Sequence, residues 1–165
     1  ASVVLDAVKL LRARGLKISD SAVKTGLEKA TWRARFEIIE RDPLVIFDGA
    51  HNPQGIRAAT DSIKTYFKDR KVCVFTGVLK DKDYNVIAKT LSEITDTAFT
   101  ITPDNPRALP AEDYAEVLST YGISATPCKD ISEALRLGKS AAKDRDTALC
   151  CLGSLYTYVE VIKAL

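Results

Sequence analysis

The sequence predicts an α/β fold, in which a mostly parallel sheet of about six strands carries helices on both faces and follows a short helical linker. Short, continuously apolar runs alternate with segments of helical periodicity. Strands that are apolar throughout are typical of parallel sheets covered on both faces. A chain of 165 residues is also long enough to bury the core of one domain with a small appendage.

The first 30 residues predict two helices. Apolar residues recur at helical spacing from Val3 to Leu11, and Gly15 follows as a stop. Either Ser19 or Ser21 could begin a second helix that runs through Leu27. We interpret residues 1–30 either as a linker from an upstream domain or as ordinary packing helices.

Residues 31–165 are predicted to form one domain, because strands and helices alternate regularly after Arg35. Strands are predicted at 36–41, 44–47, 72–75, 98–101, around 123–125 and at 148–152. Helices are predicted at 53–67, near 84–91, at about 110–118, over a segment that includes 131–137, and at 155–165. The order of these elements predicts a Rossmann-like domain.

The composition is that of an ordinary globular domain, with 46% hydrophobic residues, 28% charged residues and a net charge of +2. This balance argues against a nucleic-acid partner. Apolar runs stay short, so we expect a cytoplasmic protein without membrane contact. The four cysteines never occur at Cys-x-x-Cys spacing, which predicts reduced core thiols and no metal site. Methionine is absent, which indicates a fragment of a longer chain.

Polar residues follow four of the predicted strands, in the segments 48–52, 76–77, 102–107 and 153–154. Ligands of parallel sheets bind outside the carboxyl ends of the strands, so these loops are expected to form one binding edge. Asn52-Pro53 is a strong helix-start signal that would aim a helix amino end at this edge. Asp48 could accept a hydrogen bond from a ribose or orient a neighbouring base.

Two other side chains on this edge are candidate ligands of an anion. Ser154 could hold a carboxylate or phosphate at a helix start, and Arg107 stands in a stiff loop that suits a carboxylate. Each feature also has a purely structural interpretation: a capped turn with a solvated His51, an N-cap serine, and turn chemistry around Arg107. The chain contains neither a Gly-x-x-x-x-Gly-Lys-Ser/Thr loop nor a Gly-x-Gly-x-x-Gly fingerprint. An autonomous nucleotide hydrolase and an ordinary dinucleotide enzyme are therefore not supported.

Five segments together resemble one enzyme family: TWRARFEII (31–39), DGAHNP (48–53), GVLKDKD (77–83), DNPRALP (104–110) and GSLY (153–156). The resemblance is to the carboxyl-terminal domain of folylpolyglutamate synthase, often also dihydrofolate synthase, of the Mur ligase superfamily. It implies an ATP-dependent ligase in which a folate carboxylate is phosphorylated and the amine of L-glutamate attacks the acyl phosphate. It also implies that ATP and magnesium are held mainly by an amino-terminal ATPase domain of the same polypeptide, which is expected to be monomeric.

The resemblance also assigns roles to single residues. Arg35 matches an arginine that reaches the ATP phosphates, and Asp48, beside Asn52, matches the aspartate that holds the nucleotide ribose. His51 and Ser154 match catalytic residues that face the incoming glutamate, and whether His51 acts as a base or as a hydrogen-bond donor stays open. The family's usual Trp-Pro-Gly-Arg appears here as Trp-Arg-Ala-Arg, so Arg33 is an alternative phosphate ligand.

Two other functions remain as alternatives. DNPR also resembles the acceptor-amino-acid motif of some peptidoglycan Mur ligases, so the chain could be the matching domain of such an enzyme. It could also be a non-catalytic regulatory module of the same fold. The isolated fragment is expected to be inactive in each case, because it lacks a triphosphate-binding loop.

Overall fold

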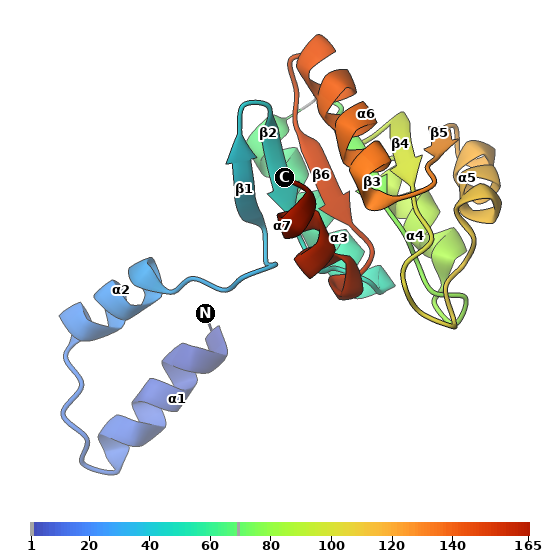
Figure 1. Ribbon diagram of the computed structural model, residues 1–165. Helices are drawn as coiled ribbons and strands as arrows, with labels where there is room; N and C mark the ends of the chain where they lie inside the picture. The colour runs from blue at the N-terminus through green and yellow to red at the C-terminus, as the bar shows by residue number, and fades with distance from the viewer. Residues whose placement is uncertain (1, 69) are drawn as a thin grey trace. The chain divides into compact units, whose positions relative to one another are not determined.

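The computed structural model describes residues 2–68 and 70–165 and forms two compact units, one that ends at Arg33 and one that spans Ala34–Leu165. In the first unit, α1 (Ser2–Ala13) and α2 (Asp20–Lys29) are the two predicted helices (Figure 1). Of the two candidate serines, Ser19 caps α2, because its Oγ accepts a hydrogen bond from the backbone N–H of Ala22 at 3.1 Å. The predicted linker falls within this unit.

The second unit is a six-stranded sheet with the strand order β1-β2-β6-β3-β4-β5. Only β1 is antiparallel to its neighbour, which confirms the predicted α/β class and the mostly parallel sheet. The strands are β1 (Glu37–Arg41), β2 (Leu44–Phe47), β3 (Cys73–Thr76), β4 (Thr97–Thr100), β5 (Ser124–Pro127) and β6 (Leu149–Leu152).

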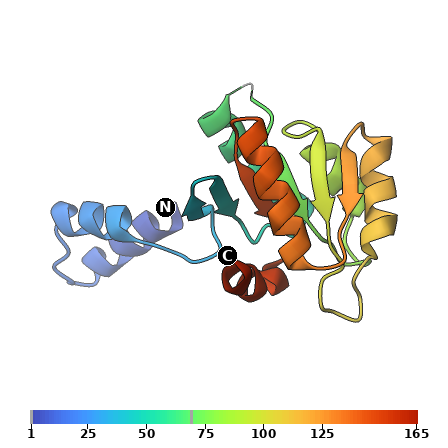
Figure 2. The ribbon, with the colours of Figure 1, turned by 45° about the horizontal axis from the view of Figure 1, so that its top comes forward.

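Helices cover both faces of this sheet, as predicted. They are α3 (Pro53–Phe67), α4 (Tyr84–Leu91), α5 (Ala111–Thr120), α6 (Ile131–Asp144) and α7 (Tyr158–Ala164). Successive strand residues point to opposite faces, so Val74 packs in one core with α3, α4 and α5, and Phe75 in a second core with α6 and α7. Figure 1 and Figure 2 show α6 lying along the sheet, on the face opposite α3.

Several predicted boundaries were wrong by a few residues. The strands at 72–75 and 98–101 are Cys73–Thr76 and Thr97–Thr100, because ladder pairing sets a strand's ends and apolar residues can extend beyond it. The last helix, predicted at 155–165, begins with a 3-10 turn, η1 (Leu155–Thr157), before α7. The buried Ser154 accepts from the backbone N–H of Tyr156, and this local hydrogen bond accompanies the tighter first turn.

The four cysteines are buried and free, which confirms the prediction of core thiols. Burial raises the pKa of Cys150 and Cys151, because a thiolate would lose its hydration inside the sheet. Among the described residues, every helix is too short or too polar to cross a bilayer.

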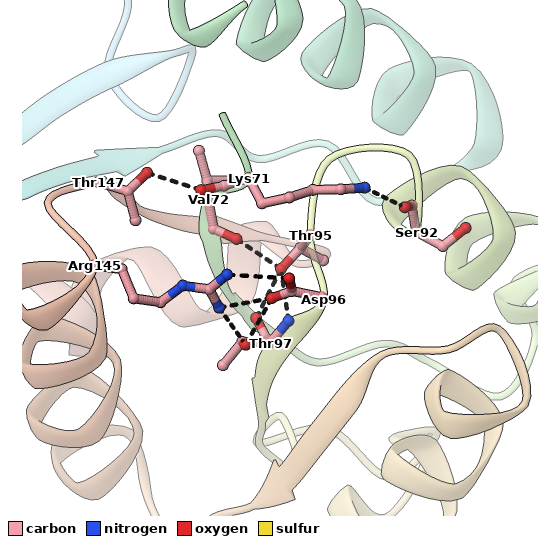
Figure 3. Close-up of polar contacts among 8 residues, drawn as sticks. All are labelled: Lys71, Val72, Ser92, Thr95, Asp96, Thr97, Arg145 and Thr147. Atoms are coloured by element: carbon pink, nitrogen blue, oxygen red, sulfur yellow. Dashed lines mark hydrogen bonds and ion pairs between the residues drawn. The ribbon is translucent and has the colours of Figure 1, made fainter. Parts of the chain in front are cut away.

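A cluster of polar side chains lies at the amino-terminal ends of the parallel strands, opposite the predicted ligand edge (Figure 3). Both terminal guanidinium nitrogens of Arg145, Nη1 and Nη2, donate to the carboxylate of Asp96, at 2.6 and 3.0 Å. The hydroxyl of Thr97 donates to the same carboxylate at 2.9 Å. These bonds, the hydrogen bond from Arg145 foremost, lower the pKa of Asp96 to about 2.

This pKa predicts how acid affects the protein. The Asp96 pKa is lower in the folded chain than its ordinary value of 3.8, so the stabilisation is complete above about pH 4 and is lost as the pH falls toward 2. Asp96→Asn should therefore lower the melting temperature by about 2–4 °C at neutral pH, the equivalent of roughly 1 kcal/mol. The difference from wild type should shrink in thermal melts between pH 4 and pH 2.

Asp104→Asn is the matched control, because Asp104 is exposed and makes no side-chain hydrogen bond or ion pair within residues 2–68 and 70–165. An Asp96→Asn difference that stays constant down to pH 2 would show that the carboxylate charge contributes nothing there.

Candidate functional site

The candidate site lies where two neighbouring parallel strands, β2 and β6, end side by side. The loops that follow them are joined by two backbone hydrogen bonds. The N–H of Asp48 donates to the carbonyl of Cys151 at 3.0 Å, and the N–H of Gly153 donates to the carbonyl of Ala50 at 2.7 Å. The topology thereby brings together the segments 48–52 and 153–154, which are separated by a hundred residues of sequence.

A first pocket, of about 320 Å³, lies against the amino end of α3 and is called here the Asp48 pocket. Its walls include Arg35, Asp48 and Asn52, which were predicted to bind the nucleotide, but not Arg33, the alternative phosphate ligand. Asn52 is the predicted N-cap, because its Oδ1 accepts from the backbone N–H of Gly55 at 2.7 Å. With Pro53 at the first helical position, the free N–H groups and the positive dipole of α3 favour an anion beside this pocket.

Asp48 has a structural function that the sequence did not reveal. Its two carboxylate oxygens accept hydrogen bonds at 2.8 Å, one from the N–H of Phe36 and one from the N–H of Ala50. Ala34 and Phe36 have φ angles of +56° and +46°, a region that costs ordinary residues roughly 1–2 kcal/mol. Arg35 stands between them, so Asp48 holds the strained turn that carries Arg35 at the pocket. A carboxylate has about four lone-pair positions, which leaves Asp48 able to accept further bonds.

Glu37 supports the same turn and was not predicted. Its Oε2 accepts from the N–H of Ala34 at 2.7 Å and from the hydroxyl of Tyr158 at 2.9 Å. The hydrogen bond from Tyr158 thereby links the turn to the start of α7. Glu37 lies between two apolar residues in a predicted strand, so nothing in the sequence pattern distinguished it from a solvent-exposed strand residue.

A second pocket, of about 340 Å³, is called here the Ser154 pocket. It contains the three residues that the sequence analysis connected with glutamate, namely His51, Arg107 and Ser154. They come from the loops after β2, β4 and β6. The remaining lining residues are Leu79, Lys82, Gly153, Leu155 and Tyr156.

His51 lines both pockets. Its Nδ1 lies 2.8 Å from the carbonyl oxygen of Gly49, and a carbonyl can only accept, so Nδ1 carries the proton of this bond. In the neutral imidazole, Nε2 is then a free lone pair that can accept a proton or a hydrogen bond. The loop therefore fixes the tautomer of the chain's only histidine.

Ser154 and Gly153 form a tightly packed corner of the second pocket. Ser154 is 3% exposed, and within the described residues its Oγ accepts from the N–H of Tyr156 at 3.2 Å while its hydroxyl proton has no acceptor. Gly153 has a φ of +106°, and a Cβ at this position would lie 2.7 Å from the carbonyl oxygen of Gly77. Only glycine fits this corner.

Lys82 is a pocket residue that was not predicted from the sequence. It lies in the GVLKDKD segment, after β3, and the rule that ligand groups follow parallel strands could have identified it. Asp81 is ion-paired with Arg107 at 3.1 Å and with Lys82 at 3.4 Å. Partial burial acts to raise the pKa of Asp81, but a backbone hydrogen bond and these two cations outweigh it and lower that pKa.

The two pockets differ in the chemistry that they offer. The Asp48 pocket combines a carboxylate, an arginine and a helix amino end, which suits a ligand with both hydroxyl groups and phosphates. The Ser154 pocket combines two cations, a buried hydroxyl and an imidazole, which suits a small carboxylate that also carries an amine. Because His51 borders both, its imidazole can contact a group bound in either pocket.

Comparisons with known proteins give the family of this fold. Residues 34–155 match the family model described as Mur ligase, glutamate ligase domain. The chain is 31% identical over 159 residues to the dihydrofolate synthase/folylpolyglutamate synthase of Escherichia coli (strain K12), which covers 96% of this chain and 36% of that protein.

Solved structures agree with the sequence comparison. The structure of E. coli FolC in complex with ADP, without folate substrate, has a TM-score of 0.83 at 29% identity and covers 95% of this chain and 37% of that chain. A bifunctional folylpolyglutamate synthase/dihydrofolate synthase with Mn, AMPPNP and L-glutamate bound has a TM-score of 0.81 at 30% identity, covering 96% and 37%. The chain thus spans little more than a third of the length of these proteins. It belongs to the Mur ligase glutamate ligase domain family, which confirms the resemblance found in its sequence.

Proposed function

We propose that this chain is the carboxyl-terminal domain of an ATP-dependent ligase that adds L-glutamate to folates. The observation that carries the proposal is the pair of adjacent pockets that share His51. The residues assigned to the nucleotide line one pocket, and the residues assigned to glutamate line the other. In the reaction, ATP phosphorylates a folate carboxylate, and the glutamate amine then displaces phosphate to form an amide.

In this proposal, the Asp48 pocket completes the nucleotide site. Asp48 accepts a hydrogen bond from the ribose, Arg35 binds the phosphates, and Asn52 holds the helix start beside them. Arg35 is exposed and, within the described residues, forms no ion pair, so its charge is available to a phosphate. A relative with ADP bound and another with AMPPNP bound support a nucleotide in proteins of this fold.

The Ser154 pocket is proposed to receive the L-glutamate. Ser154 donates its hydroxyl proton to a carboxylate, and Arg107 binds a carboxylate with its guanidinium group. His51 accepts a proton or hydrogen bond from the amine through Nε2, which makes the base role preferable to the donor role. Attack on an acyl phosphate requires a neutral amine, so a nearby acceptor of its proton promotes the step.

The rest of the site is proposed to lie on an amino-terminal ATPase domain of the same polypeptide. The chain spans 36% of the length of the E. coli relative, which leaves room for such a domain. Magnesium is assigned mainly to that domain, as the resemblance to the family implies. The folate relatives make the peptidoglycan and the purely regulatory alternatives less favoured.

The test uses the full-length protein with ATP, magnesium, a reduced folate and L-glutamate. ADP release should require all of these, and mass spectrometry should find a product heavier by one glutamyl residue. The 165-residue chain alone should be inactive. Full-length protein that forms no glutamylated product would contradict the proposal.

Asp48→Asn should weaken the use of ATP in the full-length enzyme. The loss of a charged hydrogen-bond acceptor costs about 1.5–3 kcal/mol, so the KM for ATP should rise about 10- to 150-fold while the KM for glutamate stays unchanged. Glu37→Gln is the matched control, because it loosens the same turn without lining the pocket. If both variants raise the KM for ATP equally, Asp48 acts only through the turn.

A further inference from the structure

Leu155 belongs to the Ser154 pocket, but its side chain also lies over the backbone of the Asp48 pocket. A Cβ added to Gly49, a residue of the Asp48 pocket, would stand 2.5 Å from Cγ of Leu155 and 3.0 Å from Nη1 of Arg35. The missing side chain at Gly49 therefore lets Leu155 and Arg35 approach the same small space. The proposed phosphate ligand thus has an apolar neighbour that comes from the other pocket.

Arg35 has no polar partner that orients its side chain. Within residues 2–68 and 70–165, its guanidinium group makes no hydrogen bond and no ion pair. An arginine that is free to change rotamer loses conformational entropy when it binds a ligand, and this loss weakens binding. A guanidinium group is weakly hydrated and packs well against other side chains. Packing against Leu155 is therefore the contact that can restrict Arg35 before a ligand arrives.

The segment that carries Leu155 is itself held in place. The hydroxyl of Thr157 donates to the carbonyl of Ser154 at 3.0 Å, in the buried interior of the loop. The ring of Tyr158 packs edge-to-face on Phe47, with 5.0 Å between the ring centroids. Leu155 therefore projects from a backbone that is anchored on both sides.

The turn at 34–36, which carries Arg35, is joined to the same segment. Oε2 of Glu37 accepts hydrogen bonds from the N–H of Ala34 and from the hydroxyl of Tyr158. The N–H of Gly49 donates to the carbonyl of Ala34 at 2.9 Å. The backbones of the arginine and of the leucine are thereby held in a fixed relation to one another.

We propose that Leu155 is a positioning residue, which restricts the guanidinium group of Arg35 to the orientation that binds the nucleotide phosphates. This inference rests on the proposed function, because it takes Arg35 as a phosphate ligand. Leu155 lines the Ser154 pocket and not the Asp48 pocket, so its effect on the nucleotide passes through Arg35. That effect must disappear when Arg35 is removed.

The test is a double-mutant cycle in the full-length enzyme, with the KM for ATP as the readout. Leu155→Ala should raise the KM for ATP about 2- to 12-fold, which corresponds to the entropy that one immobilised side chain loses. In an Arg35→Ala background, the same substitution should leave the KM for ATP unchanged. Leu155→Met keeps most of the volume and should stay close to wild type. Leu155 is 40% exposed, so these variants should fold, and thermal melts check this.

Val159→Ala is the matched control. Val159 lies four residues after Leu155 in the same segment, is exposed and lines neither pocket. The substitution removes apolar surface from the segment at a position outside both pockets. The KM for ATP should therefore keep its wild-type value.

The outcomes separate this inference from the proposed function. If the wild-type enzyme forms no glutamylated product, the proposed function fails and the inference fails with it. If wild type is active and Leu155→Ala leaves the KM for ATP unchanged, only the inference is overturned. An equal effect of Leu155→Ala with and without Arg35, or an equal effect of Val159→Ala, would overturn it too, because neither result depends on the orientation of Arg35.

Discussion

Gly153→Ala is expected to lower the free energy of unfolding of the chain by about 2–6 kcal/mol. A φ of +106° lies in a region that is strained for any residue with a Cβ, at about 1–3 kcal/mol. The new Cβ would also stand 2.7 Å from the carbonyl oxygen of Gly77 and 2.7 Å from Oγ1 of Thr76, and such overpacking typically adds 1–3 kcal/mol. The backbone atom cannot move away without disturbing the end of β3. Urea denaturation monitored by circular dichroism measures the loss.

Gly122→Ala separates the two contributions. Gly122 has a similar positive φ, +78°, but apart from its two chain neighbours no described residue has a heavy atom within 4 Å of where its Cβ would be. This variant should lose only the conformational part, about 1–2 kcal/mol. Equal losses in the two variants would mean that the corner between Gly77 and Gly153 is less crowded than the structure indicates.

His51→Ala and Ser154→Ala are expected to impair the use of glutamate in the full-length enzyme, each by about 10- to 150-fold in kcat/KM for glutamate, with the KM for ATP preserved. The reason is that both residues line the Ser154 pocket, where they are proposed to contact one small molecule. Loss of a proton acceptor beside the amine slows the chemical step, so His51→Ala should mainly lower kcat. Ser154→Ala should act mainly on the KM for glutamate.

The double variant tests whether the two side chains serve the same ligand. If they do, the loss in the double variant should be smaller than the sum of the two single losses in free energy. Ser154→Ala should also lower stability by about 1 kcal/mol, because it removes the cap of η1. Additive losses of stability with unaltered glutamate kinetics would remove both residues from the site and leave His51 as a loop histidine.

The sequence predicted helices well where local chemistry defines their ends. α3 has the predicted bounds, Pro53–Phe67, because Asn52 and Pro53 mark its start and a single apolar face runs along its length. Strand ends were predicted less well. β3 includes Thr76 and excludes Val72, since its limits depend on the pairing with β4 and β6.

Some residues of the candidate site could likewise be predicted from the sequence, and others could not. The rule that ligand groups follow parallel strands identified His51, Asp48, Arg107 and Ser154 from the sequence. It did not identify Glu37, whose function depends on two hydrogen bonds, to Ala34 and Tyr158, that no sequence pattern encodes. Nor did it reveal that Asp48 supports the turn around Arg35.

By itself, the sequence determined the fold class and the family and predicted a candidate ligand edge, because apolar periodicity, helix caps and short motifs are local properties of the chain. The tertiary structure decided that β6 lies between β2 and β3, and hence that Ser154 meets His51 in one pocket while Asp48 faces another. It also decided that Lys82 and Arg107 share Asp81 as their partner. These juxtapositions depend on strand order and on contacts between residues far apart in sequence, and a local pattern carries no information about either.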